Sequence, residues 1–236
     1  MKIVGQMVVG AGEADNWLEE SLKEFQRLTD DAIIATCNAT KKEKDLIKKY
    51  GFWQYEDNRE WGKSQNRIKE TLVSKIANLH PDWILALDAD ETVPTVDRKI
   101  LEDLSKVRVS TYFYVVNLIG DERHYSESLS FWNCRFYSMP SPGNRGFYHQ
   151  PLHCGSAPAF ALQQPPKESY VPHILLHKGL MRSADRERKA VRYDQYDPHA
   201  RWKGRAYYDT LRSEGRGDPF DITEVTKKIT DFCNKL

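Results

Sequence analysis

The nine residues Trp83-Ile84-Leu85-Ala86-Leu87-Asp88-Ala89-Asp90-Glu91 join an apolar run of strand length to a pair of carboxylates. The apolar run predicts a central β-strand, because such a strand is buried on both faces of a sheet. Asp88 and Asp90 are two residues apart, so they would point to the same side of an extended chain. Carboxylates this close repel each other unless a cation neutralises them. The stretch therefore predicts a divalent metal ion with oxygen ligands at the end of the strand, and the alternative is a solvated acidic turn.

The chain before this stretch alternates between apolar runs of strand length and amphipathic helical patterns. We expect strands over residues 2–9, 31–36 and 52–55, and helices over residues 17–28, 41–50 and 62–79. Such alternation is typical of an α/β fold with a mostly parallel sheet and helices on both faces. Ligands of these sheets bind where the strands end, and Asp88 and Asp90 fall there.

The second half of the chain combines aromatic-rich strands with a long loop. We expect a helix at 95–106, strands over 111–118 and 129–137 joined by a polar hairpin loop at 121–124, a loop over 140–172, a short strand at 174–176, a helix at 184–195 and a polar C-terminal region. A loop of this length is typical of binding pockets and lids. The 236 residues are expected to form a single domain.

Composition excludes several classes of protein. The formal net charge is +1 with 29% charged residues, so no broad basic surface is expected to attract nucleic acid. The four cysteines have no C-x-x-C spacing, which argues against a zinc knuckle and against a disulfide framework. The apolar run at residues 1–9 is too short and too interrupted for a signal peptide, and no segment approaches the roughly 20 apolar residues of a membrane span. We therefore expect a soluble, cytoplasmic protein.

Three motifs occur in a characteristic order: Trp61-Gly62-Lys63-Ser64-Gln65-Asn66 at the start of a helix, Asp88-Ala89-Asp90-Glu91 after the fourth strand, and His177-Lys178-Gly179-Leu180-Met181 late in the chain. With the order of elements over residues 1–91, they resemble the glycosyltransferases of family 2, which have the GT-A fold and a DxD motif. The resemblance implies a hexosyl-type transferase that depends on Mn²⁺ or Mg²⁺ and moves a sugar from a nucleotide-diphosphate-sugar donor, most commonly a UDP-sugar, to an acceptor hydroxyl. The acceptor would be a glycan, a lipid-linked molecule or a protein, and peripheral contact with a membrane is compatible with this reading.

The resemblance also assigns parts of the chain. Residues 1–92 would bind the nucleotide sugar, residues 93–180 would bind the acceptor, and residues 181–236 would form a C-terminal helical region. By position, Asp88 takes the role at the ribose and Asp90 binds the metal ion. His177 would lie on a loop after a strand and complete the metal site, and a buried structural histidine is the alternative.

The turn after the first strand would surround the nucleobase, which makes Val9, Gly10 and Ala11 expected donor contacts. Family members often have an Asp after the second strand to read the base. Here Asn38 stands in that neighbourhood, and its amide both donates and accepts hydrogen bonds but carries no charge. The identity of the base therefore stays open.

Basic residues on two helices are candidates for phosphate contacts. Lys63 and Arg67 lie one turn apart, and Asn66 lies between them, so this helix could meet the diphosphate. Arg186 and Lys189 share a face of the late helix with a similar potential. Solvated helical charges are the alternative in both cases.

A direct displacement at the anomeric carbon needs a base for the acceptor hydroxyl. Related enzymes often have a His-Glu pair after the aromatic strands, whereas this chain has His149-Gln150 and His153-Cys154. Asp121 and Glu122 are the nearest carboxylates on a plausible acceptor loop. A histidine could itself serve near neutral pH.

Two other functions fit parts of the sequence. Residues 88–92 match the D-x-D-x-T motif of haloacid-dehalogenase-like phosphatases, in which Asp88 would be the nucleophile and Asp90 the acid–base. That motif normally opens its domain, whereas three strand–helix units precede it here. The third function is a noncatalytic module that binds a glycan or a protein partner through the same fold.

Overall fold

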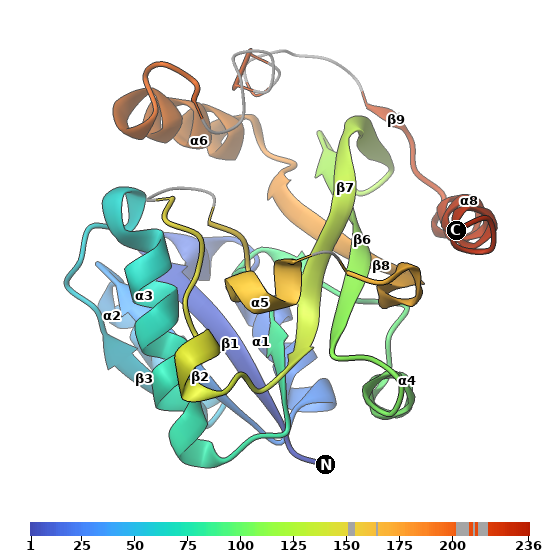
Figure 1. The fold of residues 1–236 in the computed structure, drawn as a ribbon. Coiled ribbons are helices and arrows are strands. Elements are labelled where there is room, and N and C mark those ends of the chain that lie inside the picture. The colour runs from blue at the N-terminus through green and yellow to red at the C-terminus, as the bar shows by residue number, and fades with distance from the viewer. Residues whose placement is uncertain (151–153, 164, 202–207, 210, 212–216) are drawn as a thin grey trace.

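The N-terminal half of the chain supplies four parallel strands. The computed structural model describes residues 1–150, 154–163, 165–201, 208–209, 211 and 217–236. The four strands are β1 (Ile3–Gly10), β2 (Asp31–Cys37), β3 (Trp53–Glu56) and β4 (Trp83–Ala86). They are connected by α1 (Leu18–Leu28), α2 (Lys41–Lys49) and α3 (Trp61–Ile76). β1 pairs with β2 and β4, and β3 lies outside β2, so their carboxyl ends meet at one edge (Figure 1).

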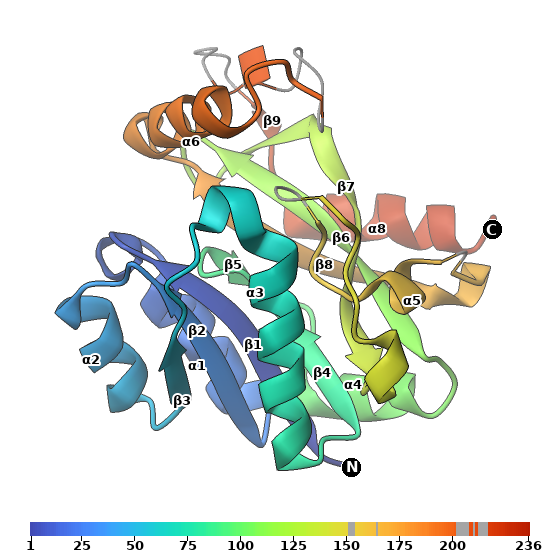
Figure 2. The same ribbon diagram turned by 60° about the vertical axis from the view of Figure 1, so that its left-hand side comes forward.

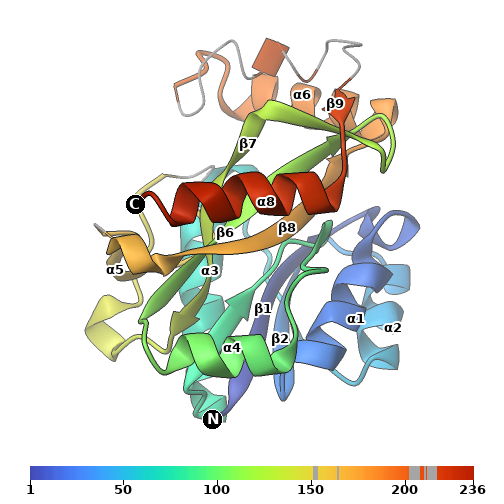
Figure 3. The ribbon, with the colours of Figure 1, turned by 90° about the vertical axis from the view of Figure 1, so that its right-hand side faces the viewer.

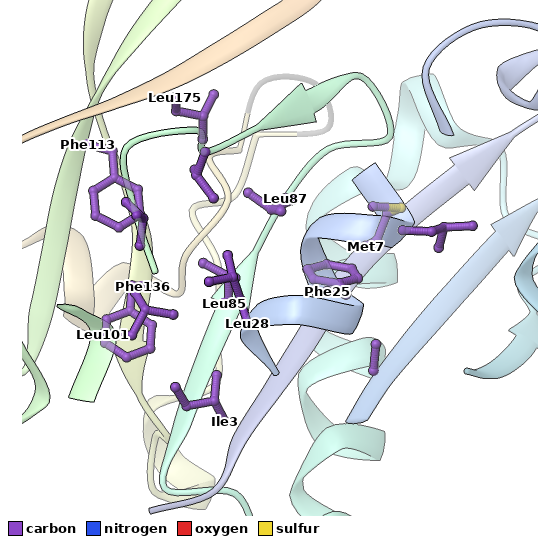
Figure 4. Close-up of a cluster of buried hydrophobic side chains, with 14 of the residues drawn as sticks. Ile3, Met7, Phe25, Leu28, Leu85, Leu87, Leu101, Phe113, Phe136 and Leu175 are labelled. Carbon is purple, nitrogen blue, oxygen red and sulfur yellow. The ribbon is translucent and has the colours of Figure 1, made fainter. Parts of the chain in front are cut away.

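Alternate residues of β1 face two different layers of helices. Ile3 and Met7 point into the cluster drawn in Figure 4, together with Phe25 of α1. Val4 points the other way, into a second cluster with Ile68 of α3. In Figure 2, α3 lies in front of the sheet and α1 behind it. The apolar period of two in the strand thus meets an apolar helical stripe on each side, which confirms helices on both faces.

Beyond β4 the sheet becomes mixed. The further strands are β5 (Glu91–Thr92), β6 (Ser110–Ile119), β7 (His124–Ser138), β8 (Tyr170–Leu180) and β9 (Asp218–Pro219). β7 pairs antiparallel with β4 and β6, β8 runs parallel to β6, and β5 and β9 add antiparallel to β8 and β7. The strand order is β3-β2-β1-β4-β7-β6-β8-β5, with β9 on β7. The predicted α/β fold class is confirmed.

Further helices of the described residues lie against the second half of the sheet or beyond the ends of its strands (Figure 1). They are α4 (Arg98–Ser105), α5 (Ala159–Leu162), α6 (Ser183–Tyr196) and α8 (Ile222–Cys233). α8 lies along β8 in Figure 3, where Val225 and Ile229 pack in one cluster with Ile174. Across the residues that the structure describes, no helix is long and apolar enough to cross a lipid bilayer.

Several predicted boundaries are wrong in the second half. β8 covers Tyr170–Leu180 rather than 174–176, so His177 lies inside a strand and not on a loop after one. The strand is longer because it pairs in parallel with β6 over most of its length. Polar residues interrupt its apolar pattern, so the sequence alone indicated a shorter strand. The expected loop at 140–172 contains short helical turns and α5. β7 begins at His124 rather than at 129, because the backbone pairing between β6 and β7 continues closer to the hairpin loop than the sequence pattern indicates.

The acidic pair also lies differently from the prediction. β4 ends at Ala86, so Asp88 and Asp90 belong to the turn that follows and not to the strand itself. The C-terminal region, expected to be polar and helical, contains the amphipathic helix α8.

Candidate functional site

A cavity of about 570 Å³ opens at the carboxyl ends of β1, β2 and β4. The start of α3, parts of β6, β7 and β8, and α6 complete its walls, and we call it the site cavity. Seven residues predicted from the sequence line it: Gly10, Ala11, Asn38, Asp88, Asp90, His177 and Lys189. Asn38 directly follows β2 with a φ of 54°, a left-handed conformation that Asn adopts more readily than most residues.

The register of the sheet sets the distance between Asp90 and His177. Glu91 in β5 pairs antiparallel with His177 in β8, and the backbone N–H of Lys178 donates to the carbonyl of Asp90 at 2.8 Å. Asp90 therefore lies beside His177, with Oδ2 3.3 Å from Nε2. The side chains of Asp90 and His177 are 14% and 16% exposed, so Oδ2 and Nε2 lie in a part of the cavity that is largely shielded from solvent.

Asn117 determines which nitrogen of His177 carries the proton. β6 places Asn117 opposite His177, and the Asn117 amide donates to the carbonyl of Leu129 at 2.7 Å. This bond turns Oδ1 toward the imidazole, where it lies 2.6 Å from Nδ1. A carbonyl oxygen only accepts, so the proton of the neutral ring is on Nδ1. The Nε2 lone pair is then available on the side of Asp90.

Lys189 brings a cation from α6 to this pair. Its Nζ lies 3.1 Å from Asp90 Oδ2 and 3.1 Å from His177 Nε2. Burial alone would raise the pKa of Asp90, but the Lys189 ammonium holds it well below its usual range. Asp90 is therefore an anion with a positive charge beside it.

A β-bulge aims Arg135 at the acidic turn. Thr111 of β6 pairs with Phe136, whereas Tyr112 pairs with Cys134, so Arg135 is the extra residue of β7 at this point. Bulges redirect side chains in this way. The Arg135 side chain is only 3% exposed.

Arg135 holds two carboxylates in place. Its Nη2 lies 3.1 Å from Asp88 Oδ2 and also donates to Glu91, and its Nη1 donates to the hydroxyl of Ser156. Glu91 is 1% exposed and accepts a hydrogen bond from the backbone N–H of Asp88 at 2.8 Å. Burial raises the pKa of Glu91 to about 8, with the charge of Asp88 adding to it and Arg135 opposing it. Asp88 itself is 45% exposed, so the network presents one carboxylate to the cavity.

Glu13 adds a further carboxylate. It lies in the 3-10 turn Glu13–Asp15 that follows β1, and it lines the site cavity. Burial and the negative charge of Asp90 raise the pKa of Glu13 to about 7. The positive charges of Lys189 and of two arginines of α6 lower it, but by less. Glu13 therefore titrates near neutral pH.

The Asp90 carboxylate is a ligand for Mn²⁺ and Mg²⁺, and His177 Nε2, 3.3 Å from Asp90 Oδ2, suits a transition metal ion such as Mn²⁺ better than Mg²⁺. Within the described part of the chain, no group of three His, Cys, Asp or Glu side chains is arranged to hold a metal ion. The other ligands of an ion on these two residues would have to be water or oxygens of a bound molecule.

In the described part of the chain, four of the residues predicted to contact the donor do not line the site cavity. Val9 is fully buried in the hydrophobic core. Lys63, 67% exposed, pairs with Glu60 at 2.8 Å, and Arg67 pairs with a glutamate one turn on. Asn66 is buried in α3. α3 therefore contributes to the cavity through other residues.

The predicted bases also lie elsewhere. Asp121 is hydrogen-bonded to the ring of a neighbouring histidine at 2.8 Å. Glu122 is hydrogen-bonded to Lys178 at 3.1 Å. It lies in a separate hollow of about 750 Å³ between α1, β8 and α8. His149 is exposed and is not among the described residues that line the site cavity. His153 lies outside the described residues.

Sequence reasoning missed several residues of the cavity. Lys69 belongs to the apolar stripe of α3, is 6% exposed, and donates to the carbonyl of Gly155 at 2.5 Å. Arg135 is a single charge within an aromatic strand. A charged residue at a position where the pattern requires an apolar one is the signal that could have identified both.

No protein-family model matches the chain, and no curated protein sequence matches it. Among solved structures, S. aureus TarS is similar over 91% of this chain and 42% of its own, with 9% identity and a TM-score of 0.46. TarS 1-349 in complex with UDP is similar over 91% of this chain and 70% of its own, with 10% identity and a TM-score of 0.46. A putative nucleotide-diphospho-sugar transferase from Desulfovibrio desulfuricans G20 is similar over 97% of this chain and 99% of its own, with 9% identity and a TM-score of 0.42.

The chain spans less than half the length of the full TarS chain that it matches. These likenesses are distant, and none of them assigns an activity to this chain.

Proposed function

We propose that this chain transfers a sugar from a nucleotide-diphosphate-sugar donor to an acceptor hydroxyl with the help of Mn²⁺ or Mg²⁺. The observation that carries the proposal is the pair of Asp90 Oδ2 and His177 Nε2, 3.3 Å apart at the carboxyl end of parallel strands. Two ligand atoms at this separation can share one divalent ion. The bound ion would supply Lewis-acid stabilisation of the leaving nucleoside diphosphate.

The nucleoside of the donor is assigned to the β1 and β2 side of the cavity. Gly10 and Ala11 offer backbone groups there, and the amide of Asn38 both donates and accepts, as recognition of a base requires. Asp88, held by Arg135, is assigned to accept hydrogen bonds from the ribose. A UDP-sugar is the donor that we test first.

The diphosphate is assigned to the cationic part of the cavity. Lys69 and Lys189 both line this part of the cavity, and both are well buried. Lys69 as a whole residue is 6% exposed, and the side chain of Lys189 is 18% exposed. Charge-assisted hydrogen bonds from buried ammonium groups to phosphate oxygens are strong. We assign to Lys69 the role expected of Lys63 and Arg67, and Lys189 keeps the phosphate contact expected for it.

The acceptor is assigned to the wall formed by β6 and β7. Phe131, 39% exposed, and Asn133 line the cavity from β7. An aromatic face beside a polar amide suits the apolar face and the hydroxyls of a sugar ring. A glycan, a lipid-linked molecule and a protein are the acceptor classes to be tried.

The first test is a thermal-shift comparison of UDP, GDP, CDP, ADP and dTDP, each with and without Mn²⁺. A ligand that binds only the folded state at 100 times its Kd adds about 2.7 kcal/mol to the free energy of unfolding. We expect one nucleotide to raise Tm in a manner that requires Mn²⁺. Asp90→Ala should lose this shift, whereas Asp103→Ala, which changes an exposed carboxylate of α4, should keep it.

Absence of a shift with every nucleotide would contradict the proposal. Trapping of a phosphate on Asp88 would instead favour the phosphatase, because sugar transfer needs no aspartyl phosphate.

A further inference from the structure

The ammonium of Lys189 lies where a divalent ion held by Asp90 and His177 would lie. Lys189 Nζ is 3.1 Å from Asp90 Oδ2 and 3.1 Å from His177 Nε2, and these two ligand atoms are 3.3 Å apart. The three atoms form a nearly equilateral triangle. Bonds from such ions to oxygen or nitrogen are about 2.0–2.2 Å long, so an ion on the same side of the pair would overlap the ammonium.

The chemistry of His177 requires that the two cations use the same side. Asn117 fixes the proton on Nδ1, so Nε2 offers a single lone pair in the plane of the ring. That lone pair either accepts a hydrogen bond from Lys189 or coordinates a metal ion. The two interactions are mutually exclusive.

The backbone of β8 closes one direction in which the ammonium could move. A Cβ added to Gly179 would lie 2.2 Å from Lys189 Nζ and 2.0 Å from Asp90 Oδ2. Lys189 also lines the site cavity, so an ammonium displaced from the pair can move toward that cavity. An ammonium that moves there would meet the proposed diphosphate.

We infer that Lys189 and the divalent ion exchange at the Asp90–His177 pair, so that the ion binds tightly only when a donor diphosphate accepts the ammonium. This inference rests on the proposed function, which supplies both the ion and the diphosphate. A cation that must be displaced lowers the affinity of the free protein for the metal. Linkage then makes the nucleotide and the metal strengthen each other's binding through Lys189.

The test is a titration of Mn²⁺ without nucleotide, followed by the electron paramagnetic resonance signal of free Mn²⁺. Lys189→Met removes the ammonium and keeps an apolar stem. We expect it to bind Mn²⁺ about tenfold more tightly than the parent protein, a gain of about 1.4 kcal/mol. Lys99→Met is the matched control, because Lys99 is an exposed helical lysine paired with Asp103 at 3.2 Å, and it should bind like the parent.

Equal or weaker binding of Mn²⁺ by Lys189→Met would overturn the exchange. A gain that survives in the double variant Asp90→Ala/Lys189→Met would also overturn it, because the ion would then be bound elsewhere. If Lys189→Met does not unfold cooperatively on heating, Lys189→Gln is judged by the same two criteria.

A second titration with UDP present separates the inference from the proposed function. UDP should increase the affinity for Mn²⁺ more in the parent than in Lys189→Met, and an equal increase would count against the exchange. A parent protein that binds no nucleotide contradicts the proposed function, yet the comparison of Mn²⁺ affinities without nucleotide still stands.

Discussion

Glu91 of β5 lies directly opposite His177 of β8, in a strand pair only two residues long. This pairing joins the acidic turn after β4 to a strand formed much later in the chain. It holds Asp90 beside His177, while Arg135 holds Asp88 and Glu91 from β7. The carboxylates of the site are therefore fixed by the sheet, and the ammonium of Lys189 is added to them from α6.

Asn117→Ala should weaken binding of Mn²⁺. The variant removes the oxygen that accepts the Nδ1–H of His177 at 2.6 Å, so the ring loses the partner that fixes its tautomer and orientation. Loss of such a partner typically costs about 10- to 100-fold in metal affinity. Titration with Mn²⁺ in the presence of UDP checks this, with the exposed Asn144→Ala as control. Unchanged affinity in Asn117→Ala would contradict the role of Asn117.

Gly179→Ala should damage the site more than the fold. The added Cβ would lie 2.0 Å from Asp90 Oδ2 and 2.2 Å from Lys189 Nζ, so these side-chain ends have to move. Displacement of Asp90 Oδ2 should weaken binding of Mn²⁺, and the free energy of unfolding should fall by no more than the overpacking range of about 1–3 kcal/mol. Urea denaturation and Mn²⁺ titration measure the two effects. Gly143→Ala is the control, because a Cβ there meets no heavy atom within 4 Å.

Arg135→Met should destabilise the fold by an amount that grows with pH. The variant removes the hydrogen bonds that this buried guanidinium donates, at a cost of about 1–3 kcal/mol near neutral pH. The pKa of Glu91 is already raised to about 8, and loss of Arg135 raises it further. Above pH 8 the parent can ionise Glu91 against Arg135, whereas the variant cannot.

Urea denaturation at pH 7 and pH 9 checks this prediction. The double variant Arg135→Met/Glu91→Gln should lose the additional cost at pH 9, because no buried acid is left to ionise. A difference between parent and Arg135→Met that stays constant with pH would contradict the ion pair.

Glu13 should make the protein less stable as pH rises toward neutrality. Its pKa in the folded protein is about 7 against a reference of 4.5, so the folded state binds the extra proton between these values. The contribution to stability is complete below pH 4.5 and is lost as pH rises through 7. Glu13→Gln should therefore flatten the dependence of the free energy of unfolding on pH in this range.

Urea denaturation between pH 4.5 and 8 measures this slope. Glu91 adds a slope of the same sign, so the informative quantity is the difference between Glu13→Gln and the parent. Glu127→Gln, at an exposed position, should retain the slope of the parent. A Glu13→Gln variant with the same slope as the parent would contradict the raised pKa.

Asp121→Asn and Glu122→Gln should leave binding of nucleotide and Mn²⁺ unchanged. Both side chains are more than half exposed and pair with residues outside the site cavity. Thermal shifts with the nucleotide and Mn²⁺ check this, together with transfer or hydrolysis of the sugar nucleotide. A strong loss of turnover in either variant would restore that residue as the base for the acceptor.

The first half of the fold was predictable because its signals are local. The apolar run at 83–87, the three preceding strand patterns and the helical stripes between them depend only on residues a few positions apart. Their order along the chain implies a parallel sheet, and a parallel sheet implies that Asp88 and Asp90 come to its carboxyl edge. Prediction was weaker where strand patterns were interrupted, as in β8, where His177 faces the site cavity and Lys178 lines the separate hollow.

Periodicity and chain order were enough to predict an α/β fold and a pair of carboxylates just after its fourth strand. The groups that surround these carboxylates depend on the tertiary structure. Arg135 reaches them through a shift of register at a bulge, His177 through pairing between β5 and β8, and Lys189 through the position of α6. Such contacts join residues far apart in the chain and depend on registers and packing that no short pattern encodes.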